Sequence, residues 1–308
     1  MFKHFRFLAI AWLAILIIPG CKKDSPDIAK SSTQEPTVSS DQVLTPAGYM
    51  DKSKVHYIGD GYHLNVANGR LQKLETKTGR IIEDYGEVTR TPSQRVPYAT
   101  GWIAYAYWSN PNTSNPITYF TTNWTVPNVP SNKGSQTIFL FNGMQDGLTS
   151  SSYIIQPVLQ WGPSAAGGGK YWAITNWYVS GSSAFYGSLI TVSAGTSLQG
   201  VMQETAHSGS NYSYSSSFTG YSSASAISVT NVPEAYWAAE TLESYGVSTP
   251  STMYPSNTDV AMTSIQILQG TTNASISWST AQAVSGSAQK AVVISNSSPG
   301  GEVDIHFR

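Results

Sequence analysis

From Tyr98 onward, the sequence consists of short runs of β-branched and aromatic residues separated by turn formers about every ten residues. Within several runs the side chains alternate, with Ile190 and Val192 on one face of an expected strand and Thr191 and Ser193 on the other. Sustained helical periodicity is scarce. The pattern predicts an all-β sandwich or barrel. The expected strands cover residues 101–108, 117–126, 137–141, 153–161, 171–179, 188–194, 197–203, 211–218, 264–269 and 291–294.

One segment conflicts with this prediction. Residues 233–246 begin with Pro233, carry several alanines in the middle and end with Gly246, which is the composition of a capped helix. Local propensity alone therefore favours a helix here.

Charge is sparse in the predicted β-region. The whole chain has 17 basic and 18 acidic residues and a net charge of −1, which argues against nucleic acid or an anionic lipid surface as a partner. From Tyr98 to the end there are only eight acids and four bases. If this region is an enzyme, few ionisable groups are available for its chemistry.

The N-terminus has the three parts of a secretory signal. Lys3 and Arg6 precede an apolar run over residues 7–18, which is shorter than the ~20 residues a transmembrane helix needs. Ile18-Pro19-Gly20-Cys21 resembles the bacterial lipobox. We therefore expect a signal peptide at 1–20, lipidation of Cys21, and a lipoprotein of the cell envelope, either periplasmic or surface-facing. Lys22 and Lys23 favour the outer membrane.

Cys21 is the only cysteine, so the mature chain has no partner for a disulfide. Residues 21–47 are rich in Ser, Thr, Pro and Lys and are expected to form a flexible tether. Residues 48–96 contain turn pairs such as Asn68-Gly69 between short apolar runs, which predicts a small β-meander. This segment either packs on the main body, residues 97–308, or is a pro-segment that covers a site; the sequence leaves both readings open.

Common catalytic motifs are absent. There is no Gly-x-Ser-x-Gly elbow, no phosphate-binding loop, no dinucleotide fingerprint, and no histidine pattern with metal-ligand spacing. We expect neither a metal nor a cofactor. Carboxylates and amides would have to carry any chemistry.

Four stretches resemble segments of the eqolisin-type glutamic peptidases, in the same order along the chain. Each is weak alone, and the order and spacing carry the resemblance over about residues 98–269. The stretches are Thr121-Thr122-Asn123-Trp124-Thr125-Val126-Pro127, residues 137–143 with Tyr153-Ile154-Ile155-Gln156, the aromatic Tyr171-Trp172-Ala173-Ile174-Thr175-Asn176-Trp177-Tyr178, and Ala235-Tyr236-Trp237-Ala238-Ala239-Glu240-Thr241-Leu242-Glu243.

The resemblance implies a concanavalin A-like or jelly-roll sandwich of two antiparallel sheets, with 235–242 as a strand despite its helix propensity. It also implies an endopeptidase acting on polypeptides. Together with the lipobox this predicts a lipid-anchored endopeptidase, which we expect to be a monomer. Glu240 falls on the family's catalytic glutamate and would be the general base and acid. Gln156 would orient the attacking water and stabilise the oxyanion. The two side chains should share one sheet face.

Five further residues are expected to contact the substrate: Asn142, Gln160, Trp161, Asn176 and Trp177. The three amides stand where the family's motifs carry acids, so the chain is either a peptidase with fewer site charges or a protein that binds without cleaving. A second alternative is a glycan-binding module, with Trp161, Trp172, Trp177 and Trp237 as a stacking platform. A glycosidase is disfavoured, because Glu240 and Glu243 would face opposite sides of one strand.

Overall fold

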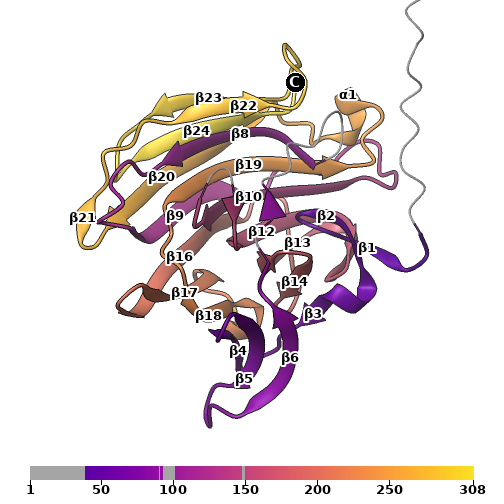
Figure 1. Cartoon of the computed structure of the whole chain (residues 1–308). Coiled ribbons are helices and arrows are strands. Elements are labelled where there is room, and N and C mark those ends of the chain that lie inside the picture. The colour runs from indigo at the N-terminus through magenta and orange to yellow at the C-terminus, as the bar shows by residue number, and fades with distance from the viewer. Residues whose placement is uncertain (1–38, 90, 93–100, 148–149) are drawn as a thin grey trace, which may run out of the picture. The chain divides into compact units, whose positions relative to one another are not determined.

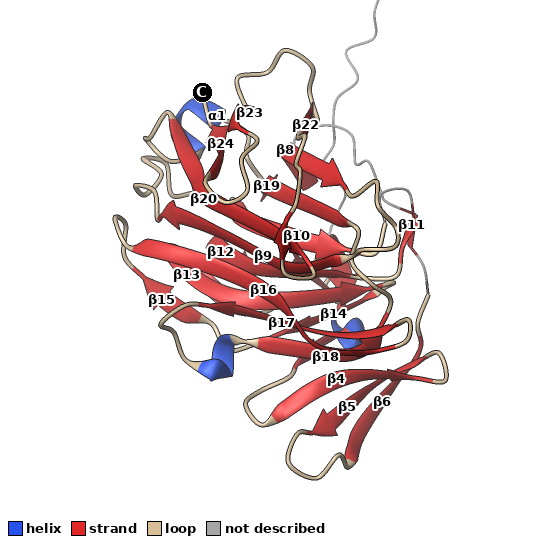
Figure 2. Cartoon of the chain, turned by 90° about the vertical axis from the view of Figure 1, so that its left-hand side faces the viewer, coloured by secondary structure: helices blue, strands red, loops and turns tan. Residues whose placement is uncertain are grey.

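The computed structural model describes residues 39–89, 91–92, 101–147 and 150–308. The expected signal peptide, the lipidation site Cys21 and the tether up to residue 38 lie outside the described residues. The described residues belong to one compact unit, Val38–Arg308. This unit is built almost entirely of strands, which confirms the all-β prediction (Figure 2).

Two large sheets form the body, and almost all their pairings are antiparallel. Sheet 1 has nine strands; eight follow the order β22-β8-β19-β10-β12-β13-β14-β3, and β15 pairs with β13. Its strands are β22 (Ser279–Gln282), β8 (Gly101–Ser109), β19 (Trp237–Tyr245), β10 (Thr137–Gln145), β12 (Ile154–Ser164), β13 (Gly167–Ser180), β14 (Ser183–Tyr186), β3 (Val55–Tyr57) and β15 (Ile190–Val192).

Sheet 2 has eleven strands; ten follow the order β23-β24-β20-β9-β16-β17-β18-β4-β5-β6, and β21 pairs with β20. Its strands are β23 (Lys290–Ser295), β24 (Gly301–His306), β20 (Asp259–Gln269), β9 (Ile117–Thr125), β16 (Ser197–Ser208), β17 (Asn211–Phe218), β18 (Ile227–Val232), β4 (Tyr62–Ala67), β5 (Arg70–Glu75), β6 (Ile81–Glu87) and β21 (Thr272–Asn273).

The remaining elements are short. Two small pairs are β1 (Gln42–Thr45) with β2 (Gly48–Asp51), and β7 (Thr91–Pro92) with β11 (Ser150–Ser151). The helical turns are η1 (Lys52–Lys54), η2 (Ser223–Ser225) and α1 (Pro250–Met253). Within the described part of the chain, no helix has the length and apolar character needed to cross a membrane.

The segment with conflicting propensities is the strand β19, which confirms the prediction made from the resemblance. It is paired on both sides, with β10 and with β8, and every residue from Trp237 to Tyr245 is buried. Two ladders of hydrogen bonds and complete burial outweigh a per-residue helix preference of at most about 1 kcal/mol.

Both faces of sheet 1 are buried at its centre. The inner face, which looks toward sheet 2, carries Ile138, Leu140 and Met144 of β10, all in the main core. The outer face carries Phe139 and Phe141 of the same strand, in a second cluster with Leu44 of β1. Figure 1 shows β1 and β2 on one side of β12 and β13, and β9, β16 and β17 on the other. The alternation that normally marks a half-exposed strand is therefore absent from β10.

The N-terminal segment is built into the body. β3 pairs in parallel with β14 at the edge of sheet 1, and β4 pairs in parallel with β18 in sheet 2, so residues 55–87 extend both sheets. The predicted tether boundary at residue 47 is too late, because β1 begins at Gln42 and Leu44, Thr45 and Pro46 are buried.

Candidate functional site

Gln156 and Glu240 lie on opposite faces of sheet 1. Across neighbouring strands, paired residues point to the same side, and Glu240 is paired with Asn142. The β10–β12 register places Phe141 opposite Val158 and Met144 opposite Ile155, so Asn142 is level with Pro157, the residue after Gln156. Gln156 therefore points away from the side that Glu240 occupies. The expectation that these two side chains share one face and one water is wrong.

Glu240 points between the sheets. Its side chain is completely buried, and its Oε1 accepts a hydrogen bond from Thr122 Oγ1 of β9 at 2.5 Å. Burial raises the pKa of Glu240 well above its ordinary value, and the Thr122 hydrogen bond opposes this shift only partly. Glu240 is thus a buried carboxyl group whose environment favours its neutral form, away from any surface that a polypeptide could reach.

Three of the predicted substrate contacts also face inward. Asn142 Nδ2 lies 3.5 Å from the Gly200 carbonyl oxygen of β16. Asn176 donates to the Ser225 carbonyl at 2.7 Å and accepts from Ser216 Oγ at 2.6 Å. Trp161 packs in the main core, with its ring 5.5 Å from that of Trp172. These residues hold the sheets together.

Gln156, Gln160 and Trp177 lie on the outer face. Gln156 and Trp177 are direct partners on β12 and β13, and Gln156 Nε2 is 3.5 Å from the Pro46 carbonyl oxygen. Gln160 Nε2 donates to the carbonyls of Gly162 at 2.7 Å and Gly167 at 2.9 Å, and its Oε1 accepts from Ser164 Oγ at 2.8 Å.

Glu243 is the acid on this outer face, and the sequence-based assignment missed it. Its side chain is fully buried, and its Oε1 accepts a hydrogen bond from the Tyr245 hydroxyl. The Trp102 indole lies near the carboxyl, but no hydrogen bond of good geometry reaches Oε2 from any residue that the structure describes. Burial raises the pKa of Glu243 to about 8, with Tyr245 and Trp102 opposing the shift.

Gln160 and Glu243 flank the same residue. Phe139 of β10 is paired with Gln160 of β12 on one side and with Glu243 of β19 on the other. The three side chains therefore form one row across three adjacent strands, on one face. The row places a glutamine and a glutamate on one face with Phe139 between them, four and three residues after the positions assigned from the sequence.

Two signals in the sequence point to this row. Val158-Leu159-Gln160 is a second apolar run that ends in a glutamine, four residues after Gln156, and Glu243 is the last glutamate of the stretch Ala235–Glu243. Choosing between Glu240 and Glu243 requires knowing which face of β19 looks outward, and the sequence contains no such information because both faces are buried.

The tryptophan platform expected for a glycan-binding module is not available. Trp161 and Trp172 are in the core between the sheets, and Trp177 and Trp237 are buried on the outer face. Trp237 is stacked between Trp102 and Tyr107, with ring centroids 5.8 Å from each. Sugar stacking requires exposed rings, which these four do not offer.

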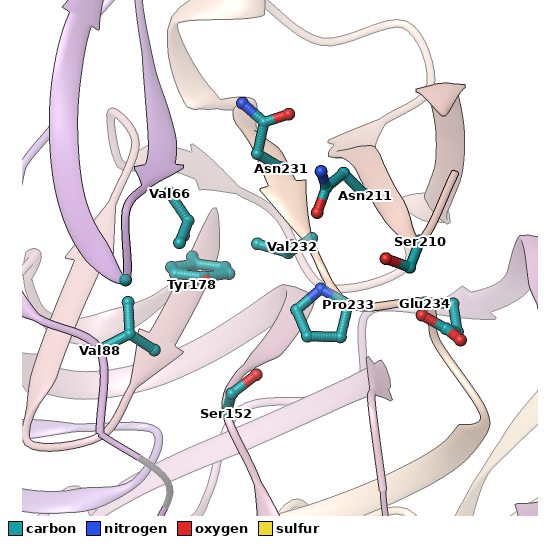
Figure 3. A pocket seen from close by; sticks show the side chains of 11 residues that line it. Val66, Val88, Ser152, Tyr178, Ser210, Asn211, Asn231, Val232, Pro233 and Glu234 are labelled. Carbon is teal, nitrogen blue, oxygen red and sulfur yellow. The ribbon is translucent and has the colours of Figure 1, made fainter. Parts of the chain in front are cut away.

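A surface pocket lies away from this row. Its volume is about 410 Å³, and none of the predicted site residues lines it (Figure 3). The pocket lining is Val66, Gly69, Val88, Ser152, Tyr178, Ser210, Asn211, Asn231, Val232, Pro233 and Glu234.

The described residues contain no cluster of three or more His, Cys, Asp or Glu that could hold a metal ion.

No family model matches the sequence, and no curated protein matches it. Similar solved structures include a scytalido-glutamic peptidase with a peptide-based transition-state analogue, at 15% identity and a TM-score of 0.43, covering 68% of this chain and 100% of that one. SCP-B, a member of the eqolisin family in complex with the tripeptide Ala-Ile-His, has 14% identity and a TM-score of 0.42, covering 68% and 98%.

Proposed function

We propose that this chain is an endopeptidase, anchored by lipid at Cys21, whose acid–base residue is Glu243 and whose amide partner is Gln160. The observation that carries the proposal is the row Gln160–Phe139–Glu243 on the outer face of sheet 1. Glu243 has one carboxyl oxygen without a hydrogen-bond partner and a pKa raised to about 8, both suited to proton transfer.

Glu240 also has an unpartnered oxygen and a raised pKa, but it points between the sheets, where it accepts from Thr122. The matched segments of sequence predict the pair at Gln156 and Glu240, and the assignment moves to Gln160 and Glu243 because only these two share the row on the outer face.

The reaction needs one activated water and one stabilised oxyanion. Ionised Glu243 takes a proton from the water as the water oxygen bonds to the peptide carbonyl carbon. The Gln160 amide N–H donates to the resulting oxyanion. Protonated Glu243 then gives its proton to the leaving nitrogen as the C–N bond breaks, and the carboxylate is restored. Gln160 must first release the Gly162 and Gly167 carbonyls, so the described arrangement is a resting state.

Four single variants of the full-length chain test the assignment. We expect Glu243→Gln to lower cleavage of a denatured protein substrate by about 10²–10⁴-fold, and Gln160→Ala by about 10²–10³-fold. Glu240→Gln and Gln156→Ala are the matched controls at the originally assigned positions, and we expect both to retain cleavage. Circular dichroism checks that all four variants are folded. Full activity in Glu243→Gln, or loss confined to Glu240→Gln and Gln156→Ala, would rule out the proposed pair.

A further inference from the structure

The outer-face row is covered by the chain's own N-terminal hairpin. This cover hairpin, Gln42–Asp51, pairs β1 with β2 from Gln42 opposite Asp51 to Thr45 opposite Gly48. It forms a separate two-stranded sheet and does not extend either large sheet. Figure 1 shows it beside β12 and β13, on the side away from β9 and β16.

Its contacts converge on the proposed site. Leu44 belongs to the apolar cluster that contains Phe139, and its carbonyl accepts from the Ala165 N–H at 2.8 Å. The Pro46 carbonyl oxygen lies 3.5 Å from Gln156 Nε2. The Tyr49 ring meets the edge of the Tyr245 ring at 6.0 Å, and Tyr245 is the residue that hydrogen-bonds Glu243. The hairpin thus spans the face from Gln156 to the neighbour of Glu243.

The covered face contains buried polar atoms without partners. Among the residues that the structure describes, five such atoms share this face: Gln156 Oε1, Trp177 Nε1, Trp237 Nε1, Thr241 Oγ1 and Glu243 Oε2. A buried polar group without a hydrogen-bond partner destabilises the folded state, and most buried polar groups in proteins are satisfied. The face therefore offers donors and acceptors that the hairpin does not use.

An extended polypeptide can form hydrogen bonds with both the donors and the acceptors of this face. Its backbone supplies N–H and C=O groups at regular intervals, and its side chains can enter the apolar cluster where Leu44 now sits. The contact between Pro46 and Gln156 shows that a peptide carbonyl already lies beside a side-chain amide of this face.

We propose that the outer face between Gln156 and Tyr245 is a polypeptide-binding site that the cover hairpin occupies in the resting protein. The hairpin excludes other chains until it swings away, and it mimics an apolar, extended ligand. An isolated two-stranded hairpin is marginally stable, so it opens more readily than the paired strands beneath it. This inference rests on the proposed function for its biological purpose, but binding can be measured without catalysis.

A reversible lock tests the inference in the full-length chain. Leu44→Cys with Ala165→Cys, in a Cys21→Ser background, places two thiols at adjoining backbone positions, so oxidation ties the hairpin to the β12–β13 turn. The reduced form lacks the Leu44 side chain and has a loosened hairpin. The matched control is Gln42→Cys with Asp51→Cys, which joins β1 to β2 without tying either to sheet 1.

The probe is a fluorescein-labelled synthetic peptide that copies Asp41–Lys52, and its binding is followed by fluorescence anisotropy. We expect the reduced lock variant to bind at least about tenfold more tightly than the oxidised form, because apparent affinity scales with the open fraction. The control should bind alike in both redox states. Equal binding by the oxidised and reduced lock variant, or binding by neither, would overturn the inference.

Cleavage assays on the same samples separate the two proposals. Redox-dependent peptide binding without cleavage in any form would support the binding site and contradict the peptidase proposal. Equal cleavage by the oxidised and reduced forms of the lock variant would support the peptidase proposal and contradict the covering role of the hairpin.

Discussion

Glu240 and Glu243 show how one strand sends two similar residues into different environments. Glu240 is directly opposite Asn142, and among the described residues Glu240 Oε2 and Asn142 Oδ1 both lack a hydrogen-bond partner. Two acceptors repel each other, whereas a protonated Glu240 could donate to the amide oxygen. The raised pKa of Glu240 agrees with that protonation state. We therefore assign Glu240 a structural role as a neutral hydrogen-bonding acid.

This assignment predicts a pH dependence of stability. The folded state holds the Glu240 and Glu243 protons more tightly than the unfolded state, whose pKa is near 4.5. The free energy of unfolding should therefore fall as pH rises above that value, by up to about 1.4 kcal/mol per pH unit for each group. For Glu243 the fall should end near pH 8, its folded-state pKa.

Urea denaturation at several values between about pH 5 and about pH 8 measures this slope. We expect Glu240→Gln to reduce the slope and the double variant with Glu243→Gln to flatten it further, because an amide does not titrate. An unchanged slope in Glu240→Gln would show that this carboxyl group does not hold its proton in the folded state.

At the scale of the element, strand β16 of sheet 2 lies close against sheet 1 at Gly200. A Cβ atom added at Gly200 would lie 2.6 Å from Asn142 Oδ1, 2.7 Å from Pro157 Cγ and 2.8 Å from the Trp124 ring. All three neighbours are packed between the sheets. Glycine is required here by the close approach, because no larger residue fits without moving one of the sheets.

Gly200→Ala should therefore destabilise the protein by about 1–3 kcal/mol, the range for overpacking in a core. The midpoint of urea denaturation measures the change, and Gln203→Ala, at an exposed position of the same strand, is the control. A loss of stability equal to that of the control would mean that the sheets can separate at little cost.

At the scale of the whole molecule, the fold joins parts of the chain that the sequence analysis predicted to be separate. The segment 55–87 extends both large sheets, which agrees with the reading that it packs on the body. In our proposal the covering role falls to the cover hairpin, Gln42–Asp51, which spans the expected boundary at residue 47 between the tether and the segment 48–96.

The proposed membrane attachment is also a property of the whole chain, and it depends on a single residue. Cys21→Ser should move the protein from the membrane fraction to the soluble fraction after cell lysis, because acyl chains supply the attachment. Immunoblotting of the two fractions, with an intact-mass measurement of the purified chain, checks both the location and the lipid. A wild-type mass without added lipid would contradict the proposal.

The sequence by itself determined the strand content, the turn positions and the scarcity of ionisable groups, because these follow from local propensity and composition. Helix propensity misassigned residues 235–242, and only the resemblance corrected it. The faces of sheet 1 were decided by tertiary structure alone. Strands buried on both sides, such as β10 and β19, carry apolar residues on both faces, so periodicity cannot say which way Glu240 or Glu243 points. Strand register and the packing of sheet 2 and the cover hairpin make that choice, through contacts between residues far apart in the chain.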